Sequence, residues 1–177
     1  MRILLVGAGG VGTAFARIAA RRSFAELVVA DYDLGRALRA AAAKDSYRAV
    51  QLDARDDAAT AALLTGHGCD VLMNATDPRF VMPLFRAALQ AGTHYLDMAM
   101  SLSQPHPVEP HRQPGVKLGD EQFALSGEWE KRGKLALAGM GVEPGLSDVF
   151  ARFAADQLFR SINEIGVRDG ANLVVEG

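Results

Sequence analysis

A glycine-rich turn near the start of the chain has the spacing of a phosphate-binding loop. It fits the pattern G-x-G-x-x-G, with an apolar run of strand length before it and an amphipathic helical stretch after it. In such a unit the first glycine makes a tight turn, the second lets the backbone approach a pyrophosphate, and the third lets helix and strand pack closely. Free amides at the helix N-terminus then hold the phosphates. We therefore predict a dinucleotide site at Gly7, Gly9, Gly10, Val11 and Gly12, because a turn that binds nothing would not need this setting.

An aspartate follows the second apolar run at the distance expected of a ribose ligand. Asp31 lies 19 positions after Gly12, where a carboxylate accepts hydrogen bonds from the adenosine ribose hydroxyls. A 2′-phosphate would bring about −1.5 to −2 charges against it, so NAD is favoured over NADP. Arg36 and Arg39 lie a few residues on and leave NADP binding open. The alternative for Asp31 is a solvated turn residue at the strand exit.

Polar residues also end the third and fourth predicted strands. Ligands collect at the carboxyl ends of parallel strands, so these residues are candidates for the rest of the cofactor site. Asp53 is placed to reach the adenine amino group, and Asn74 and Ala75 are placed to border the ribose and the nicotinamide. The segment Asp53–Asp56 equally suits a cap of the next helix, and both interpretations stay open.

Two places offer the ionisable groups that hydride transfer needs beyond its cofactor. Asp97 ends the fifth predicted strand, and strand alternation turns it to the same face as Tyr95. Glu143 lies in a glycine-rich turn before a helix, where exposed amides could receive a substrate carboxylate and Glu143 could contact a cationic amine. The structural alternatives are that Asp97 only anchors the proline-rich loop through backbone amides, and that Glu143 and Asp148 only complement the helix dipole. Asp97 and Glu143 are our candidate catalytic residues.

Composition limits the remaining function classes. The 177 residues carry 19 basic and 21 acidic side chains, a net charge of −2, without the basic cluster that a nucleic-acid partner requires. No apolar run reaches the roughly 18 residues of a membrane helix. The single cysteine excludes an internal disulfide, so we expect a cytoplasmic protein. The histidines lack the spacing of metal ligands, and we expect no metal.

Apolar runs of strand length alternate with helical periodicity, which is typical of a parallel sheet with crossover helices. Strands are predicted over residues 3–6, 27–30, 49–52, 71–74, 93–98 and 135–138. Helices are predicted over residues 11–19, 34–42, 57–64, a stretch ending near 91, 120–131 and 144–158, with a long proline-rich loop over 101–119. Residues 162–175 alternate as if beginning another sheet. The predicted fold class is α/β, a doubly wound and mostly parallel Rossmann sheet.

Four motifs together resemble the saccharopine dehydrogenase-like family of NAD(P)-dependent amino-acid oxidoreductases. They are Gly7–Gly12, Asp70–Ala75, Thr93–Asp97 and Gly141–Ser147, of which the last two are the most discriminating in combination. The resemblance implies a Rossmann domain, which we place at residues 1–158. It also implies a second α/β domain that covers the substrate and usually mediates dimerisation, and residues 159–177 would be its incomplete beginning.

The resemblance also implies an activity. Its members make or break a carbon–nitrogen bond at an amino-acid carbon, with NAD or NADP as cofactor and an amino acid or amino-acid-derived amine as substrate. We expect this chain to retain the cofactor-binding part of such an enzyme, and the full-length form to be a homodimer. The alternative is a nucleotide-sensing Rossmann module without catalytic activity.

Overall fold

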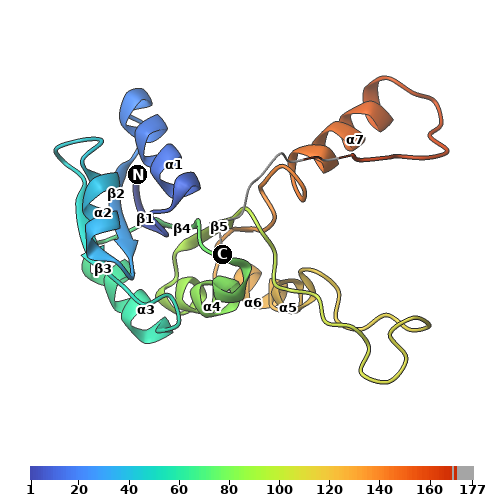
Figure 1. The fold of residues 1–177 in the computed structure, drawn as a ribbon, viewed down its shortest axis with the longest axis horizontal. Helices are drawn as coiled ribbons and strands as arrows, with labels where there is room; N and C mark the ends of the chain where they lie inside the picture. Colours follow the sequence, from blue (N-terminus) through green and yellow to red (C-terminus); the bar gives the residue numbers. More distant parts are fainter. Residues whose placement is uncertain (169, 171–177) are drawn as a thin grey trace.

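Six parallel strands form one sheet in the order β3-β2-β1-β4-β5-β6 in the computed structural model, which describes residues 1–168 and 170 (Figure 1). The strands are β1 (Arg2–Val6), β2 (Glu26–Asp31), β3 (Arg48–Gln51), β4 (Val71–Asn74), β5 (His94–Asp97) and β6 (Ala136–Leu137). The order reverses between β1 and β4, so a crevice opens at their carboxyl ends, where open α/β sheets bind ligands. The structure confirms the predicted fold class.

Helices cover both faces of this sheet (Figure 1). One face packs against α1 (Gly10–Arg22) and α2 (Leu34–Ala41), and the other packs against α3 (Asp57–Gly66) and α4 (Val81–Ala91), which follows the short turn η1 (Pro78–Phe80). Right-handed crossovers dictate this division, because the first two connections run toward β3 and the later ones run toward β6.

The two cores explain why the central strands are apolar throughout. Alternate residues of β1 enter opposite cores, with Leu5 on the side of α1 and Leu4 on the side of α4, and both are fully buried. A strand covered on both faces needs apolar residues at every position. This packing fixes the register of β1 and therefore the place where its carboxyl end meets the glycine-rich turn.

Several boundaries in the second half differ from the sequence prediction. The helix predicted over 120–131 is two helices, α5 (Asp120–Phe123) and α6 (Ser126–Lys131), because the amides of Leu125 and Glu128 form tighter bonds to carbonyls three residues back. The helix predicted from residue 144 begins later, as α7 (Leu146–Gln157), since Gly145 has a φ of +130°. Pro83 lies in the first turn of α4, where its missing amide costs no hydrogen bond.

Two segments project from the body of the molecule (Figure 1). Residues 101–119 form an arm whose regular pairing, within the described ranges, is one antiparallel bridge between Gln104 and Val116. The second segment is α7, whose predicted apolar stripe lies 47% to 63% exposed at Leu146, Val149, Phe150 and Phe153.

The predicted beginning of a second domain, residues 159–177, is described only in part. Residues 159–168 contain neither helix nor strand, and the apolar run at 173–175 lies outside the described residues. The division at residue 158 therefore stays a prediction. Among the helices of residues 1–168, none is long and apolar enough to cross a bilayer.

Candidate functional site

The glycine-rich turn between β1 and α1 is shaped by two close backbone approaches. Gly7 has a φ of +98°, and a Cβ there would lie 2.6 Å from the carbonyl oxygen of Ala75. A Cβ at Gly12 would overlap the carbonyl oxygen of Gly7, so only glycine lets α1 approach the turn this closely. By contrast, an added Cβ at Gly9 or Gly10 meets no atom within 4 Å. The turn is therefore tight on its inner side and open on its outer side.

The first turn of α1 presents unpaired amides to this open side. Thr13 donates to the carbonyl of Gly9 at 2.9 Å, but the amides of Gly10, Val11 and Gly12 have no acceptor in the described part of the chain. Gly9, the N-cap residue, carries no side chain to cap them, and the first turn holds no acidic residue. Unpaired amides and the positive end of a helix dipole together form an anion site.

Asp31 clamps the same turn from the end of β2. One carboxylate oxygen accepts a hydrogen bond from the amide of Ala8 at 2.7 Å, and the other accepts from the amide of Asp33 at 2.9 Å. The residue is 8% exposed, so the alternative of a solvated turn residue is wrong. A carboxylate offers about four acceptor positions, and these two bonds leave the others available to a ligand.

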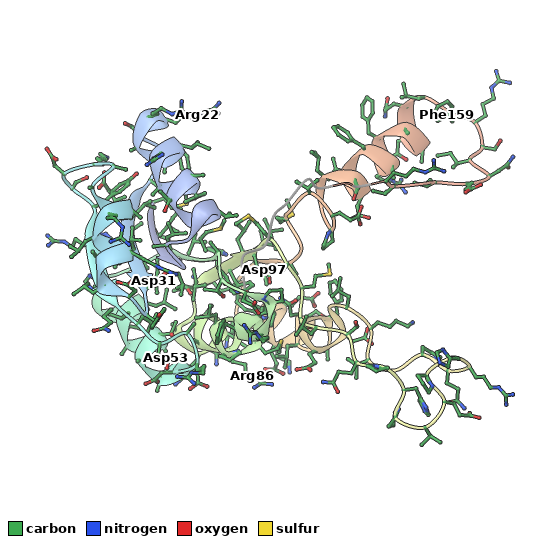
Figure 2. All side chains as sticks on the ribbon, in the orientation of Figure 1. Arg22, Asp31, Asp53, Arg86, Asp97 and Phe159 are labelled. Atoms are coloured by element: carbon green, nitrogen blue, oxygen red, sulfur yellow. The ribbon has the colours of Figure 1, made fainter. Side chains whose placement is uncertain are left out.

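A cleft of about 430 Å³ lies at the carboxyl ends of β1, β2 and β3. Five of the predicted cofactor residues line it: Gly7, Gly9, Asp31, Asp53 and Ala75. Figure 2 shows Asp31 and Asp53 on this part of the molecule, with Asp97 farther along toward β5. Tyr32, Arg36 and Phe80 also line the cleft, and sequence reasoning assigned only Arg36 a role there.

Asp53 enters the cleft as half of an ion pair. Its two oxygens accept from the Arg55 guanidinium at 3.0 and 2.6 Å, and this pairing lowers the pKa of Asp53 to about 2. The segment 53–56 does cap α3, but the N-cap is Asp56, whose side chain accepts from the amide of Ala59, and not Asp53. The adenine contact predicted for Asp53 would have to form beside this ion pair.

A smaller cavity of about 110 Å³ adjoins the cleft on the side of β4 and β5. The two share Ala75 and Thr76 in their walls, so they lie side by side along the sheet edge, and together we call them the depression. Val11, Asn74 and Asp97 line the smaller cavity. The predicted site residues thus border this depression, except Gly10 and Gly12 in the first turn of α1, and Glu143.

Asp97 is the centre of a buried hydrogen-bond cluster. One oxygen accepts from the amide of Gly139 at 2.6 Å, and the other accepts from the Tyr95 hydroxyl at 2.9 Å and from the Gln122 side chain at 2.8 Å. Asn74 in turn donates to the Tyr95 hydroxyl at 3.0 Å. The cluster joins the carboxyl ends of β4, β5 and β6. The backbone amide that Asp97 binds is Gly139, after β6, and not an amide of the proline-rich loop, which in the described part of the chain is hydrogen-bonded to Asp97 only through Gln122.

Burial sets the electrostatics of this cluster. Desolvation raises the pKa of Asp97 above the ordinary aspartate value, although the hydrogen bonds from Gly139, Gln122 and Tyr95 oppose that change. Desolvation, followed by the nearby Asp97 charge, likewise raises the pKa of Tyr95. A carboxylate with a raised pKa at the end of a cleft is the type of group that functional sites use for proton transfer.

Glu143 lies outside both cavities. It is exposed on the turn between β6 and α7, and that turn is tied to the site through the Gly139 amide, which bonds Asp97. The amides of Gly145, Leu146 and Ser147 already donate to acceptors within the turn and α7. The amides expected to bind a substrate carboxylate are therefore already bonded within the chain. The turn also packs closely against the chain, since a Cβ at Gly141 would lie 2.5 Å from the Met98 carbonyl oxygen.

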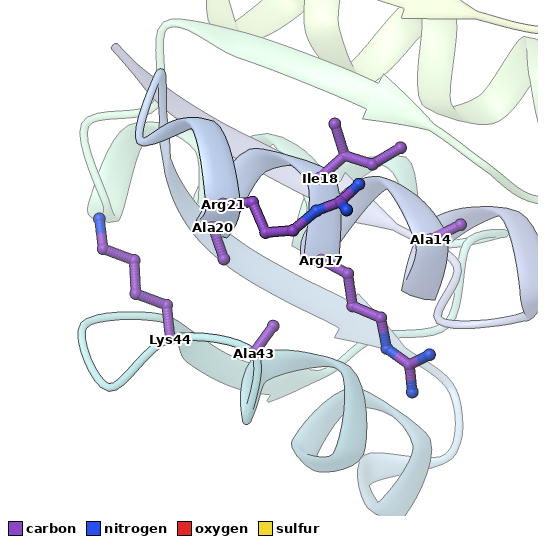
Figure 3. Close-up of a pocket in the computed structure, with 7 residues that line it drawn as sticks. All are labelled: Ala14, Arg17, Ile18, Ala20, Arg21, Ala43 and Lys44. Atoms are coloured by element: carbon purple, nitrogen blue, oxygen red, sulfur yellow. The ribbon is translucent and has the colours of Figure 1, made fainter.

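A second, separate cavity of about 730 Å³ lies between α1 and the segment after α2 (Figure 3). Arg17, Arg21 and Lys44 line it, and Lys44 is already paired with Glu26. None of the predicted site residues lies in its walls. It is larger than the depression at the carboxyl edge, but it lacks the unpaired amides and convergent polar groups found there.

These features define the class of the domain. A six-stranded parallel sheet with its order reversed between β1 and β4, and an open glycine turn at that reversal, is the architecture of the Rossmann dinucleotide-binding domains. The chain belongs to the family described as saccharopine dehydrogenase NADP binding domain, which matches residues 3–137.

Two curated relatives match nearly the whole chain. Carboxyaminopropylagmatine dehydrogenase of Synechocystis sp. is 30% identical over 173 residues, which cover 95% of this chain and 41% of that protein. Carboxynorspermidine synthase of Vibrio cholerae is 29% identical over 181 residues, which cover 96% of this chain and 43% of that protein. The chain therefore spans less than half the length of these relatives.

Solved structures show the same fold. The apo saccharopine dehydrogenase (L-Glu forming) of Saccharomyces cerevisiae superposes with a TM-score of 0.68 at 22% identity, covering 89% of this chain and 31% of that one. A UDP-N-acetylglucosamine 3-dehydrogenase of Acidithiobacillus ferrooxidans superposes with a TM-score of 0.59 at 21% identity, covering 88% of this chain and 42% of that one.

The contact between α1 and the turn can be tested by adding a methyl group. Gly12→Ala should destabilise the protein by about 1–3 kcal/mol, because its Cβ would overlap the Gly7 carbonyl and push α1 away from β1. Urea denaturation measures the change. Gly10→Ala is the matched control, since its Cβ meets open space and alanine favours the helix. Equal stability of the two variants would contradict the close-packing role of Gly12.

All the hydrogen bonds described for the Asp97 carboxylate are donated to it, so an isosteric substitution that introduces a donor at this position should lower the stability of the protein. An asparagine side chain at this position would place its NH2 group against either the Gly139 amide or the Tyr95 and Gln122 donors, so Asp97→Asn should destabilise the protein by about 1–3 kcal/mol. Denaturation at pH 7 measures the loss, with Asp45→Asn, outside the cluster, as control. A variant as stable as the wild type would show that the cluster accepts a neutral donor.

Proposed function

We propose that this chain is the nucleotide-binding part of an NAD(P)-dependent oxidoreductase that acts on the carbon–nitrogen bond of an amino acid or an amino-acid-derived amine. The observation that carries the proposal is the row of unpaired amides at Gly10, Val11 and Gly12, which opens onto the depression between β1 and β4. Membership of the saccharopine dehydrogenase family supports the reaction class.

The residues present fit a dinucleotide. The open side of Gly9 and Gly10 would admit the pyrophosphate, which the α1 amides would hold. Asp31 would bind the adenosine ribose, with Asp53 nearer the adenine, while Asn74 and Ala75 would border the nicotinamide ribose and ring. The bound nicotinamide would supply hydride transfer, and the protein would supply orientation and proton handling.

We propose catalytic roles for Asp97 and Glu143 on different grounds. Asp97 lines the inner cavity, and its buried carboxylate could hold or release a proton there. Glu143 is exposed on the turn after β6, which the Gly139 amide joins to Asp97, and there it could contact a cationic amine brought in from solvent. The names of the two relatives each join a carboxyl group to an aliphatic amine, which supports an amino-acid-derived amine as the substrate class.

The cofactor we propose is NAD, although the family is described as NADP-binding. The buried charge of Asp31 would repel a 2′-phosphate. Arg36 lines the same cleft and could attract that phosphate, but Asp33 lies 3.7 Å from the Arg36 guanidinium and partly neutralises its positive charge. The full-length protein would act as a cytoplasmic homodimer, with the part beyond this chain covering the substrate.

Titration of the 177-residue chain with NADH and NADPH tests the cofactor site. We expect NADH to bind about tenfold more tightly by calorimetry, because Asp31 favours free ribose hydroxyls over a phosphate. Arg36→Ala should weaken NADPH binding further and leave NADH affinity within about twofold. Tighter binding of NADPH to the wild type would overturn the choice of NAD, and binding of neither dinucleotide would overturn the proposed function.

A further inference from the structure

A buried glutamine reaches back to β5 from beyond the arm. Gln122 belongs to α5 and lies 25 residues after Asp97 in the sequence, yet it is only 2% exposed. Glutamine is mostly found at protein surfaces, so a fully buried one needs specific hydrogen bonds. Its contact with β5 is made by the tertiary fold and not by a local sequence pattern.

Both ends of the Gln122 side-chain amide are bonded. Nε2 donates to Asp97 Oδ2 at 2.8 Å, and Oε1 accepts from the backbone amide of Ser101 at 2.8 Å. A backbone N–H can only donate, so the Ser101 amide fixes which way the side-chain amide is turned. Gln122 therefore presents a donor to Asp97.

We propose that Gln122 is a positioning residue for Asp97. It holds the carboxylate at the inner end of the cofactor depression and ties the first residue of the arm, Ser101, to the same carboxylate. The importance of Asp97 for the reaction rests on the proposed function, but the Gln122 contact can be measured without any ligand.

The direction of the hydrogen bonds makes this role specific. The Thr76 hydroxyl donates to Asn74 at 2.7 Å, Asn74 donates to Tyr95, and Tyr95 donates to Asp97. The chain of donors thus runs toward the carboxylate from one side, and Gln122 donates to it from the other. An acceptor at position 122 would face Asp97 with a lone pair unless it carried a proton.

Few other charged groups lie near Asp97 and Gln122 in the described part of the chain. The groups that face it from β4, β5 and the turn after β6 are uncharged donors: Asn74, Tyr95 and Gly139. Glu121 on α5 lies 4.0 Å from Arg86 on α4, on the exposed side of both helices. His94 is at the opposite end of β5, where it accepts from the Leu135 amide. A carboxyl group at position 122 would therefore titrate mainly against Asp97.

Gln122→Glu tests the proposal because it keeps the side-chain size and the acceptor for Ser101 but replaces the donor. While the two carboxyl groups share a proton, the wild-type bond is preserved, and once both are ionised they repel. Trp129, the single tryptophan, reports the change because its ring packs 5.0 Å from Phe85 and 6.3 Å from Tyr95.

We expect the fluorescence and NADH affinity of Gln122→Glu to match the wild type at about pH 6 and to change in one titration as the pH rises. At about pH 8.5 its NADH affinity should be at least about tenfold lower, whereas the wild type shows no such titration. Gln113→Glu is the matched control, since Gln113 also donates to a carboxylate, Glu109, at 2.6 Å but on the exposed arm. It should change neither quantity at any pH.

The proposal would be overturned if the folded Gln122→Glu protein had the fluorescence and NADH affinity of the wild type at every pH. It would also be overturned if these quantities differed from the wild type by the same amount at every pH. If that variant does not fold, Gln122→Met decides: unchanged NADH affinity would overturn the positioning role, and a loss of about tenfold with circular dichroism retained would support it. Should the wild type fail to bind NADH, the proposed function fails, and the fluorescence titration alone then decides the role of Gln122.

Discussion

The contact between the backbone of Gly7 and the first turn of α1 is the constraint on which the candidate site depends. No side chain fits at Gly12 without overlapping the Gly7 carbonyl, and none fits at Gly7 without meeting Ala75. These two restrictions bring β1, α1 and the end of β4 together at one point. The α1 amides can then point into the crevice where the strand order reverses, so the anion site results from backbone packing and not from charged side chains.

The other half of the depression depends on Asp97. Its carboxylate accepts hydrogen bonds from three donors, which lie on β5, on α5 and on the turn after β6. A buried carboxylate is costly, and satisfied hydrogen bonds are what make it tolerable. The carboxylate that we propose for proton transfer is therefore the same group that holds β5, α5 and the turn after β6 together.

The sequence predicted what local patterns determine. Strand runs, helical periodicity and the glycine spacing each depend on neighbours within a few residues, and they predicted the six strands and the helices α1 to α4. The Asp53–Arg55 pair, the occupied amides around Gly145 and the contact of Gln122 with Asp97 depend on partners that periodicity does not reveal. The glycine-rich turn around residue 141 was predicted to receive a substrate carboxylate, but at Gly141 the group that approaches most closely is the chain's own Met98 carbonyl.

Asp31 shows why shape and specificity are linked in this turn. One of its oxygens holds the Ala8 amide, which belongs to the glycine-rich loop, and the same carboxylate borders the space where the ribose would lie. Removing its charge to admit a 2′-phosphate would also release the Ala8 amide and loosen the loop that we propose holds the pyrophosphate. A change of cofactor preference is therefore more easily reached through Arg36, whose guanidinium lines the cleft without holding the turn, than through the carboxylate itself.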